Sequence, residues 1–242
     1  ETSLERQALL PMLSMEEMKG SQIGENAIMD TVVRRLSGIS EYRSLFQSAF
    51  GTDVVTQDNI LKAIAVFERT IIANNSRFDQ YMNGNTAALN NQEIDGMNTF
   101  ISAGCADCHK GALLSDFELH TIGVPNHNLV MDNGANGSFD FRTPSLRNVE
   151  LTAPYMHNGR FNSLRDVVEF YDDVSGRRGG RDGVINNQIG FNQLDEDVRD
   201  LNLNNNDINE IVAFLRTLTD RDFDRTIPAR VPSNLPVGGN IN

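Results

Sequence analysis

The stretch Gly104-Cys105-Ala106-Asp107-Cys108-His109 decides the fold of this 242-residue chain, because it contains the only two cysteines. Two cysteines three positions apart, with histidine directly after them, form the Cys-x-x-Cys-His pattern of c-type haem attachment. One helical turn can carry both thiols, each of which forms a thioether with a haem vinyl group. The adjacent imidazole of His109 then reaches the iron. The sequence therefore predicts covalently bound haem c at Cys105, Cys108 and His109.

Two other interpretations use the same residues. A redox-active Cys-x-x-Cys pair is typical of a βαβ context. A zinc site needs further ligands, for which His120 and His127 are the candidates. The preceding sequence favours haem, because it predicts a helix that runs into Cys105, with Asn90 as N-cap and Glu93 at position N3. The expected apolar face of this helix consists of Ile94, Met97 and Ile101.

Apolar residues at helical spacing recur along the rest of the chain and predict an all-α fold with long loops. Two expected helices end at Gly38 and Gly51, and a longer one is capped by Thr56. Asn, Gly and Asp residues concentrate in segments 123–140 and 175–183, which are expected to be loops. The expected core-facing positions of the Thr56 helix and of the last helix are Ile60, Ala63, Ile64, Phe67 and Ile71, and Ile208, Ile211, Val212, Leu215 and Leu218.

The charge balance excludes two classes of partner. The chain has 21 basic and 33 acidic side chains and a formal net charge of −12, whereas nucleic acids and anionic membranes require clustered Lys and Arg. Its apolar runs are far shorter than the roughly 20 residues of a spanning helix. We therefore predict no nucleic-acid partner and no membrane span. The chain starts with Glu1, and we expect either a removed targeting segment or a piece of a longer protein.

Three further segments carry a resemblance to a known family. They are Phe141-Arg-Thr-Pro-Ser-Leu-Arg-Asn-Val-Glu-Leu-Thr-Ala-Pro-Tyr-Met-His-Asn-Gly159, Phe78-Asp-Gln-Tyr81, and Ile211-Val-Ala-Phe-Leu-Arg-Thr-Leu218. Together with the haem motif they resemble the bacterial di-haem cytochrome c peroxidases and the related enzyme MauG. The resemblance covers residues 4–220.

Members of this family have a peroxidatic N-terminal haem domain and an electron-transfer C-terminal haem domain. The resemblance implies an all-α fold in which a cytochrome c-like domain follows a partial second one. Residues 1–75 would be the residual part of the peroxidatic domain, residues 76–224 the electron-transfer domain, and residues 225–242 an extended tail. Because this chain has a single Cys-x-x-Cys-His, the N-terminal haem is expected from a missing domain or from a second chain.

The segment from Leu4 to Met18 resembles the family stretch that lines the distal side of the first haem. Gln7, Pro11 and Glu17 fall on its pocket positions, and the resemblance implies that Glu17 moves a proton between the peroxide oxygens. It thus implies a peroxidase that reduces hydrogen peroxide with electrons from a small redox protein or a protein substrate. The alternative is a monohaem cytochrome that acts only in electron transfer and keeps these residues as relics.

Tyr171 is the expected second axial ligand of the haem iron. Ser163 and Asp166 predict a capped helix that places Tyr171 on its apolar face. On periodicity alone, Tyr171 would be a buried core residue. It lies fourteen residues after His157, where the peroxidases carry a Met ligand and MauG a Tyr ligand, so the resemblance implies ligation by Tyr171 and a low-potential haem. Met156 is the alternative ligand.

The resemblance implies further contacts with cofactors. It places His157 close to the haem in a hydrogen-bonding role. Arg147 is a candidate partner of the haem propionates, with a surface salt bridge as the alternative. The backbone carbonyls of Thr152 and Pro154 match a calcium site. Ala103 stands where MauG carries a surface tryptophan. Because c-type attachment occurs outside the bacterial cytoplasm, we expect a periplasmic location.

Overall fold

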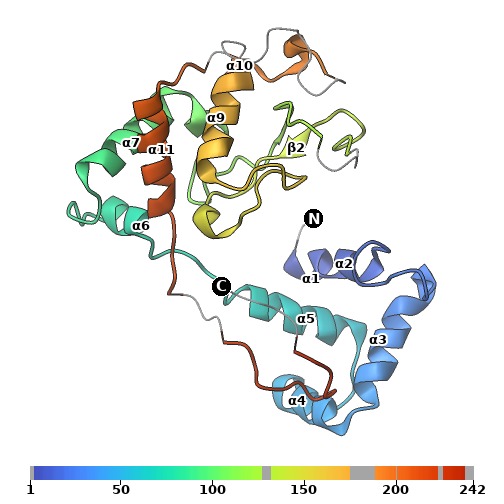
Figure 1. Ribbon diagram of the computed structural model, residues 1–242. Helices are drawn as coiled ribbons and strands as arrows, with labels where there is room; N and C mark the ends of the chain where they lie inside the picture. Colours follow the sequence, from blue (N-terminus) through green and yellow to red (C-terminus); the bar gives the residue numbers. More distant parts are fainter. Residues whose placement is uncertain (1–2, 127–131, 175–188, 200, 223–225, 238–242) are drawn as a thin grey trace. The chain divides into compact units, whose positions relative to one another are not determined.

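The protein folds into two compact helical units, and the predicted all-α class is confirmed (Figure 1). The computed structural model describes the chain except for residues 1–2, 127–131, 175–188, 200, 223–225 and 238–242. Unit 1 consists of residues 1–72 and 223–242, and unit 2 of residues 73–222. The loop predicted at 175–183 and the zinc candidate His127 lie outside the described residues.

Unit 1 is built from short helices around one apolar core. Its elements are α1 (Leu4–Gln7), α2 (Leu9–Leu13), a 3-10 turn at Glu25–Ala27, α3 (Ile28–Ser37), α4 (Ser40–Phe50) and α5 (Gln57–Glu68). The predicted boundaries at Gly38, Gly51 and Thr56 are confirmed. Gly51 ends α4 with a φ of 73°, and Thr56 caps α5 by accepting a hydrogen bond from Asn59 N at 3.2 Å. The core consists of Ala8, Met12, Ile28, Met29, Phe46, Val55, Ile60 and Leu61.

The predicted apolar face of α5 is wrong in part. Ile60 is buried as expected, but Phe67 is 64% exposed and Ile71 lies beyond the end of the helix. Leu61 and Ala65 are buried in their place. The apolar stripe of this helix is wide, so periodicity alone does not determine its rotation. Packing against α1 selects the buried face.

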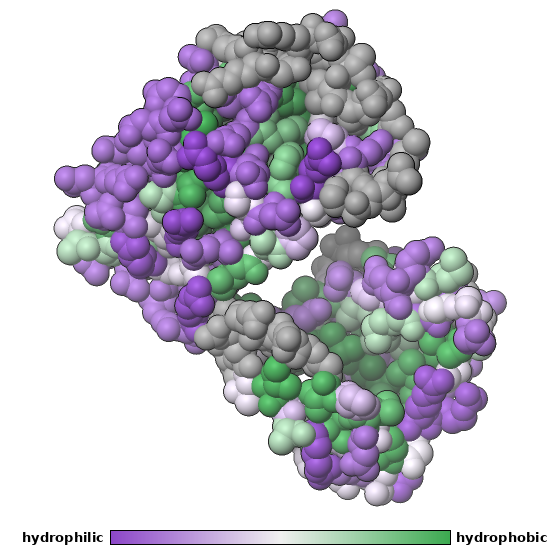
Figure 2. Space-filling view, in the orientation of Figure 1, coloured by the Kyte–Doolittle hydropathy of each residue, from purple (hydrophilic) through white to green (hydrophobic). Residues whose placement is uncertain are grey.

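Large hydrophobic side chains remain exposed on unit 1. Leu10 is 49% exposed, Met18 65% and Val66 60%. Figure 2 shows such hydrophobic side chains over unit 1, whereas hydrophilic ones dominate the visible face of unit 2. Within unit 1, an ion pair of 2.9 Å between Arg230 and Glu41 connects the segment 226–237 with α4.

Unit 2 contains the haem motif. Its elements are α6 (Arg77–Met82), α7 (Asn91–Ser102), α8 (Cys105–Cys108), β1 (Leu119–His120), β2 (Phe141–Arg142), a 3-10 turn at Val149–Leu151, α9 (Leu164–Val174), a second 3-10 turn at Phe191–Gln193, α10 (Glu196–Arg199) and α11 (Asn205–Thr217). The strands β1 and β2 form a short antiparallel pair that the sequence analysis did not foresee. The strands are two residues long, too short for a recognisable alternation of apolar and polar residues.

Helix α7 begins as predicted but presents a different face to the core. The predicted capping box between Asn90 and Glu93 is present. Ile101, however, is 57% exposed, and the buried positions include Gly96 and Phe100. A glycine carries no hydrophobic signal, so a pattern of apolar side chains could not reveal that the contact face centres on Gly96.

The contact between α7 and α11 organises unit 2 (Figure 1). A Cβ atom on Gly96 would lie 1.9 Å from the carbonyl oxygen of Glu210 and 3.1 Å from Cβ of Phe214. Only glycine permits this approach of the two backbones. The surrounding core consists of Phe100, Leu114, Leu146, Leu164, Val168, Leu201, Leu203, Ile208, Ile211, Phe214, Leu215 and Leu218.

Candidate functional site

The two cysteines occupy the ends of a one-turn helix. The predicted continuous helix into Cys105 is wrong, because α7 ends at Ser102 and Gly104, with a φ of 84°, redirects the chain into α8. The side chains of Cys105 and Ala106 pack against the core of unit 2. The helix therefore carries Cys105 and Cys108 one turn apart, as double thioether attachment requires.

His109 is oriented for iron ligation. It follows α8 directly, and its backbone N–H donates to Cys105 O at 3.0 Å. Its ring Nδ1 lies 3.1 Å from the carbonyl oxygen of the buried Leu114. Because a carbonyl only accepts, Nδ1 must carry the proton, which leaves the lone pair of Nε2 available to a metal. Burial also lowers the pKa of His109, which favours the neutral imidazole that iron requires.

The thiols have the properties of structural rather than redox-active cysteines. Burial raises the pKa of Cys105 to about 12 and that of Cys108 to about 11, and the carboxylates of Asp116, Asp197 and Asp195 add to the shift at Cys108. A reactive Cys-x-x-Cys pair needs a lowered thiol pKa. The electrostatics of this site therefore disfavour the thiol–disulfide alternative.

Tyr171 lies on α9 and packs against the same core as Cys105. The predicted cap of this helix is present, since Asp166 N donates to Ser163 Oγ at 3.1 Å. Tyr171 is partly buried and packs against the core of unit 2. Its pKa is raised by burial and, to a smaller extent, by the charges of Cys105 and Cys108. The phenol is therefore close enough to both thiols to interact with them electrostatically.

Met156 and His157 lie on a loop that returns to the small sheet. The backbone N–H of Tyr155 donates to Phe161 O at 2.7 Å and closes the loop. Met156 has a φ of 69° and packs against a second apolar cluster, which Tyr171 also contacts. The ring of His157 stacks on Phe141 of β2 with a centroid distance of 3.6 Å. Met156, the alternative iron ligand, and His157, which was expected to hydrogen-bond near the haem, thus lie on the same closed loop.

The guanidinium group of Arg147 is hydrogen-bonded to other groups of unit 2. Its Nη1 and Nη2 atoms bind the two carboxylate oxygens of Asp79 at 2.9 Å each, and Nε donates to Ala112 O at 2.7 Å. Burial raises the pKa of Asp79, but its hydrogen bonds, with that from Arg147 the strongest, bring the pKa below its usual value. The pair is more than a surface salt bridge, because both side chains are largely buried. Its predicted contact with haem propionates remains a prediction.

The other predicted positions belong to other segments of the chain. Thr152 and Pro154 are exposed on the segment after the first 3-10 turn of unit 2. In unit 1, Gln7 ends α1, Pro11 lies within α2, and Glu17 follows in an exposed turn. The hydrogen bond from Met18 N to Pro11 O, 3.1 Å long, folds this turn back onto α2.

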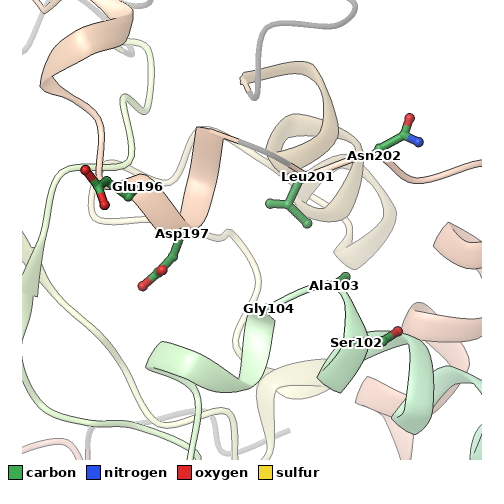
Figure 3. A pocket seen from close by; sticks show the side chains of 7 residues that line it. All are labelled: Ser102, Ala103, Gly104, Glu196, Asp197, Leu201 and Asn202. Atoms are coloured by element: carbon green, nitrogen blue, oxygen red, sulfur yellow. The ribbon is translucent and has the colours of Figure 1, made fainter.

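A pocket of about 410 Å³ opens beside the haem motif (Figure 3). Figure 3 shows Asp197 of α10 pointing toward α8. The lining residues are Ser102, Ala103, Gly104, Glu196, Asp197, Leu201 and Asn202. The α10 side of the pocket is therefore lined by two carboxylates.

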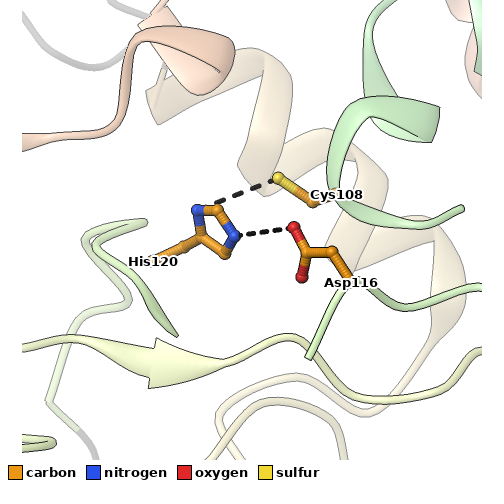
Figure 4. A group of neighbouring side chains, drawn as sticks. All are labelled: Cys108, Asp116 and His120. Carbon is orange, nitrogen blue, oxygen red and sulfur yellow. Dashed lines mark hydrogen bonds and ion pairs between the residues drawn. The ribbon is translucent and has the colours of Figure 1, made fainter. Parts of the chain in front are cut away.

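A carboxylate cluster around His120 was not predicted from the sequence. His120 Nε2 lies 3.0 Å from Asp116 Oδ2, Nδ1 contacts Asp195, and the Sγ atom of Cys108 is 3.9 Å from Nδ1 (Figure 4). The spacing of Asp116 and His120 is a weak local signal. Asp195 is 75 residues away along the chain, and no sequence pattern connects it with His120.

The fold and this site define a c-type cytochrome. A single-turn helix presents two adjacent thiols, a neutral imidazole offers Nε2, and a phenol lies beside them. This donor set fits haem c. Among the described residues, the group of side chains that could bind a metal ion without haem is Cys108, Asp116 and His120, and it does not include Cys105.

Comparisons with known proteins narrow this class to one family. The family model described as di-haem cytochrome c peroxidase matches residues 1–87. The chain is 33% identical to cytochrome c551 peroxidase of Nitrosomonas europaea, covering 96% of this chain and 63% of that protein. It is 31% identical to the methylamine utilization protein MauG of Methylophilus methylotrophus, covering 90% and 61%. The chain belongs to the di-haem cytochrome c peroxidase and MauG family.

Solved structures agree with this assignment. A MauG-like protein associated with microbial copper homeostasis superimposes with a TM-score of 0.74 at 28% identity, covering 90% of this chain and 69% of that one. The di-haem peroxidase BthA from Burkholderia thailandensis, at 23% identity and a TM-score of 0.66, shares the fold. The chain spans a little over three fifths of the length of the curated relatives named above.

Among the described helices, none is long and apolar enough to cross a membrane.

Proposed function

We propose that this chain is the electron-transfer part of a periplasmic di-haem peroxidase of the MauG type. Cys105 and Cys108 would hold haem c covalently, and this haem would pass electrons toward hydrogen peroxide. The single observation that carries the proposal is the arrangement of α8. It places both thiols beside a histidine whose Nδ1 is bound to Leu114 O and whose Nε2 is available to iron. When bound, haem supplies one-electron oxidation and reduction.

The chain's own residues would set the properties of this haem. His109 would supply a ring nitrogen to the haem iron, and Tyr171 would supply its phenolate oxygen. An anionic oxygen donor stabilises ferric iron, which lowers the reduction potential. The phenol is neutral in the metal-free site, because burial raises its pKa. Ligation would thus require the charge of the iron to displace the phenolic proton.

Replacing Tyr171 by Phe tests this ligand. The optical and EPR spectra of the ferric haem are expected to change, because the axial oxygen is lost while the ring still fills its place. Tyr155→Phe is the matched control, since Tyr155 is also partly buried but its hydroxyl lies 3.5 Å from Glu150 O. Spectra of Tyr171→Phe identical to those of the parent would rule out the ligand. A change in Met156→Leu alone would transfer the assignment to Met156.

Unit 1 would contribute the distal side of the peroxidatic haem. In this proposal Gln7 and Pro11 shape the pocket, and Glu17 moves a proton between the peroxide oxygens. The haem itself would come from a further haem domain or from a partner chain. Two observations support this. The curated relatives are longer than this chain, and unit 1 exposes large hydrophobic side chains that a partner surface would cover.

Glu17→Gln is expected to lower peroxide turnover by about 100-fold, the low end of what general acid–base catalysis contributes. The assay uses the protein carrying both haems, with a reduced redox protein as donor. Glu16→Gln is the matched control, because Glu16 is the exposed neighbour in the same turn. Equal peroxide turnover in the two variants would show that Glu17 has no catalytic role. Turnover by this chain with one haem and no partner would contradict the need for a second haem.

Four further residues would bind calcium or contact the haem. The carbonyls of Thr152 and Pro154 would bind calcium, with other ligands supplied from outside this chain. His157 would hydrogen-bond near the haem, and Arg147 would face its propionates. The carboxylates of Glu196 and Asp197, which line the pocket beside α10, suit a basic redox protein as electron donor, because opposite charges steer such encounters.

A further inference from the structure

The two ring nitrogens of His120 are hydrogen-bonded to two carboxylates beside the haem motif. Its Nε2 lies 3.0 Å from Asp116 Oδ2, and its Nδ1 makes a very short contact with Asp195 Oδ2. Figure 4 shows the ring of His120 with Cys108 and Asp116 beside it, and dashed lines mark its contacts with both. The side chains of His120 and Asp116 are 20% and 10% exposed, so water screens their interaction only in part. Asp195 N also donates to Thr121 O at 3.1 Å and so fixes its own segment against β1.

This geometry determines the protonation state of the ring. Ionised carboxylates only accept hydrogen bonds, so two carboxylate partners require a proton on each ring nitrogen. Burial lowers the pKa of His120, but the hydrogen bonds to Asp195 and Asp116 outweigh it, and the pKa is raised overall. The pKa of Asp116 falls to about 2, because hydrogen bonds from Glu118 N–H, Thr143 and His120 exceed its own burial cost. His120 is therefore an imidazolium ion.

The two carboxylates that contact this cation both carry the opposite charge. Asp116 precedes β1 and Asp195 precedes α10, and two further carboxylates near Cys108 are Asp197 of α10 and Asp107 of α8. All four raise the pKa of Cys108. The Sγ atom of Cys108 is 3.9 Å from His120 Nδ1.

We propose that His120 is the proton-exchanging partner of the haem, releasing a proton when the haem is oxidised and binding one when it is reduced. This rests on the proposed haem attachment at Cys105 and Cys108. Oxidation removes one electron, which passes to the acceptor, and leaves an added positive charge on the haem. That charge repels the imidazolium, so one of its protons moves to solvent. Reduction by the donor protein reverses both transfers, and solvent supplies the proton.

The same side chains do not form a metal site in the haem-bearing protein. The sulfur of Cys108 is then a thioether, and both imidazole nitrogens carry protons directed at Asp116 and Asp195. A metal ion would have to displace these protons and compete with an ion pair that is already satisfied. The geometry thus favours proton exchange.

The test is the pH dependence of the haem reduction potential in the holoprotein. The potential of the parent is expected to fall with rising pH, by at most about 59 mV per tenfold change in proton concentration. The fall should extend from the pKa of His120 with the haem oxidised to its pKa with the haem reduced, because the added positive charge makes the first lower than the second. His120→Gln is expected to abolish this dependence. Glu118→Gln, which removes an exposed negative charge two residues from His120, should keep it.

Asp195→Asn gives an independent readout. It keeps a hydrogen-bonding group beside Nδ1 but removes one negative charge, so the pH range of the fall should move to lower pH. A potential that does not vary with pH in the parent, or the parental slope in His120→Gln, would overturn the inference. If His120→Gln fails to bind haem, an unmoved range in Asp195→Asn overturns it instead. Haem content is measured first, because a parent chain without covalent haem would contradict the proposed function itself.

Discussion

Gly96→Ala is expected to destabilise unit 2 by about 3 kcal/mol or more, the upper end of the cost of overpacking a core. The added Cβ would lie 1.9 Å from Glu210 O and 2.5 Å from Glu210 C, which are backbone atoms of α11. No side-chain rotation relieves such a clash, so the two helices must move apart. Alanine favours a helix over glycine by about 1 kcal/mol, and this gain is smaller than the loss of packing.

Chemical unfolding followed by far-UV circular dichroism measures the effect. Asn98→Ala is the matched control on α7, because Asn98 is exposed and the substitution changes helix propensity without adding atoms to the contact. The parent and the control should unfold at similar denaturant concentrations, and Gly96→Ala well below them. Parental stability of Gly96→Ala would show that α7 and α11 do not approach as closely as described.

Replacing both Cys105 and Cys108 by alanine is expected to abolish covalent haem binding completely. Each thiol supplies one thioether bond, and the chain contains no other cysteine. Each single variant should retain one bond and therefore bind some haem covalently. This outcome separates haem attachment from a disulfide, because a disulfide is lost completely with either thiol.

Intact-protein mass spectrometry after denaturation measures covalent haem directly. Ser102→Ala is the matched control, since Ser102 is exposed at the end of α7 and its hydroxyl donates to Thr99 O. The control should carry the mass of one haem for each chain. Haem that remains bound to the double variant after denaturation would disprove attachment through these thiols.

Local features of the helices were predictable from the sequence. Thr56, Asn90 with Glu93, and Gly51 act on backbone groups within a few residues, so their effect depends little on the rest of the chain. The buried faces were less predictable. Phe67 and Ile101 were both expected in the core and are exposed, because the partner helix rather than apolar spacing determines which side of α5 and α7 is covered.

The sequence by itself determined the all-α class and the haem motif, because both follow from spacings of a few residues. Tertiary structure alone decided the pairs that lie far apart along the chain. Asp195 reaches His120 across 75 residues, Asp79 reaches Arg147 across 68, and Gly96 meets the backbone of Glu210. Such pairs form only after the chain has folded back on itself, and their hydrogen bonds and close contacts leave no periodic trace in the sequence.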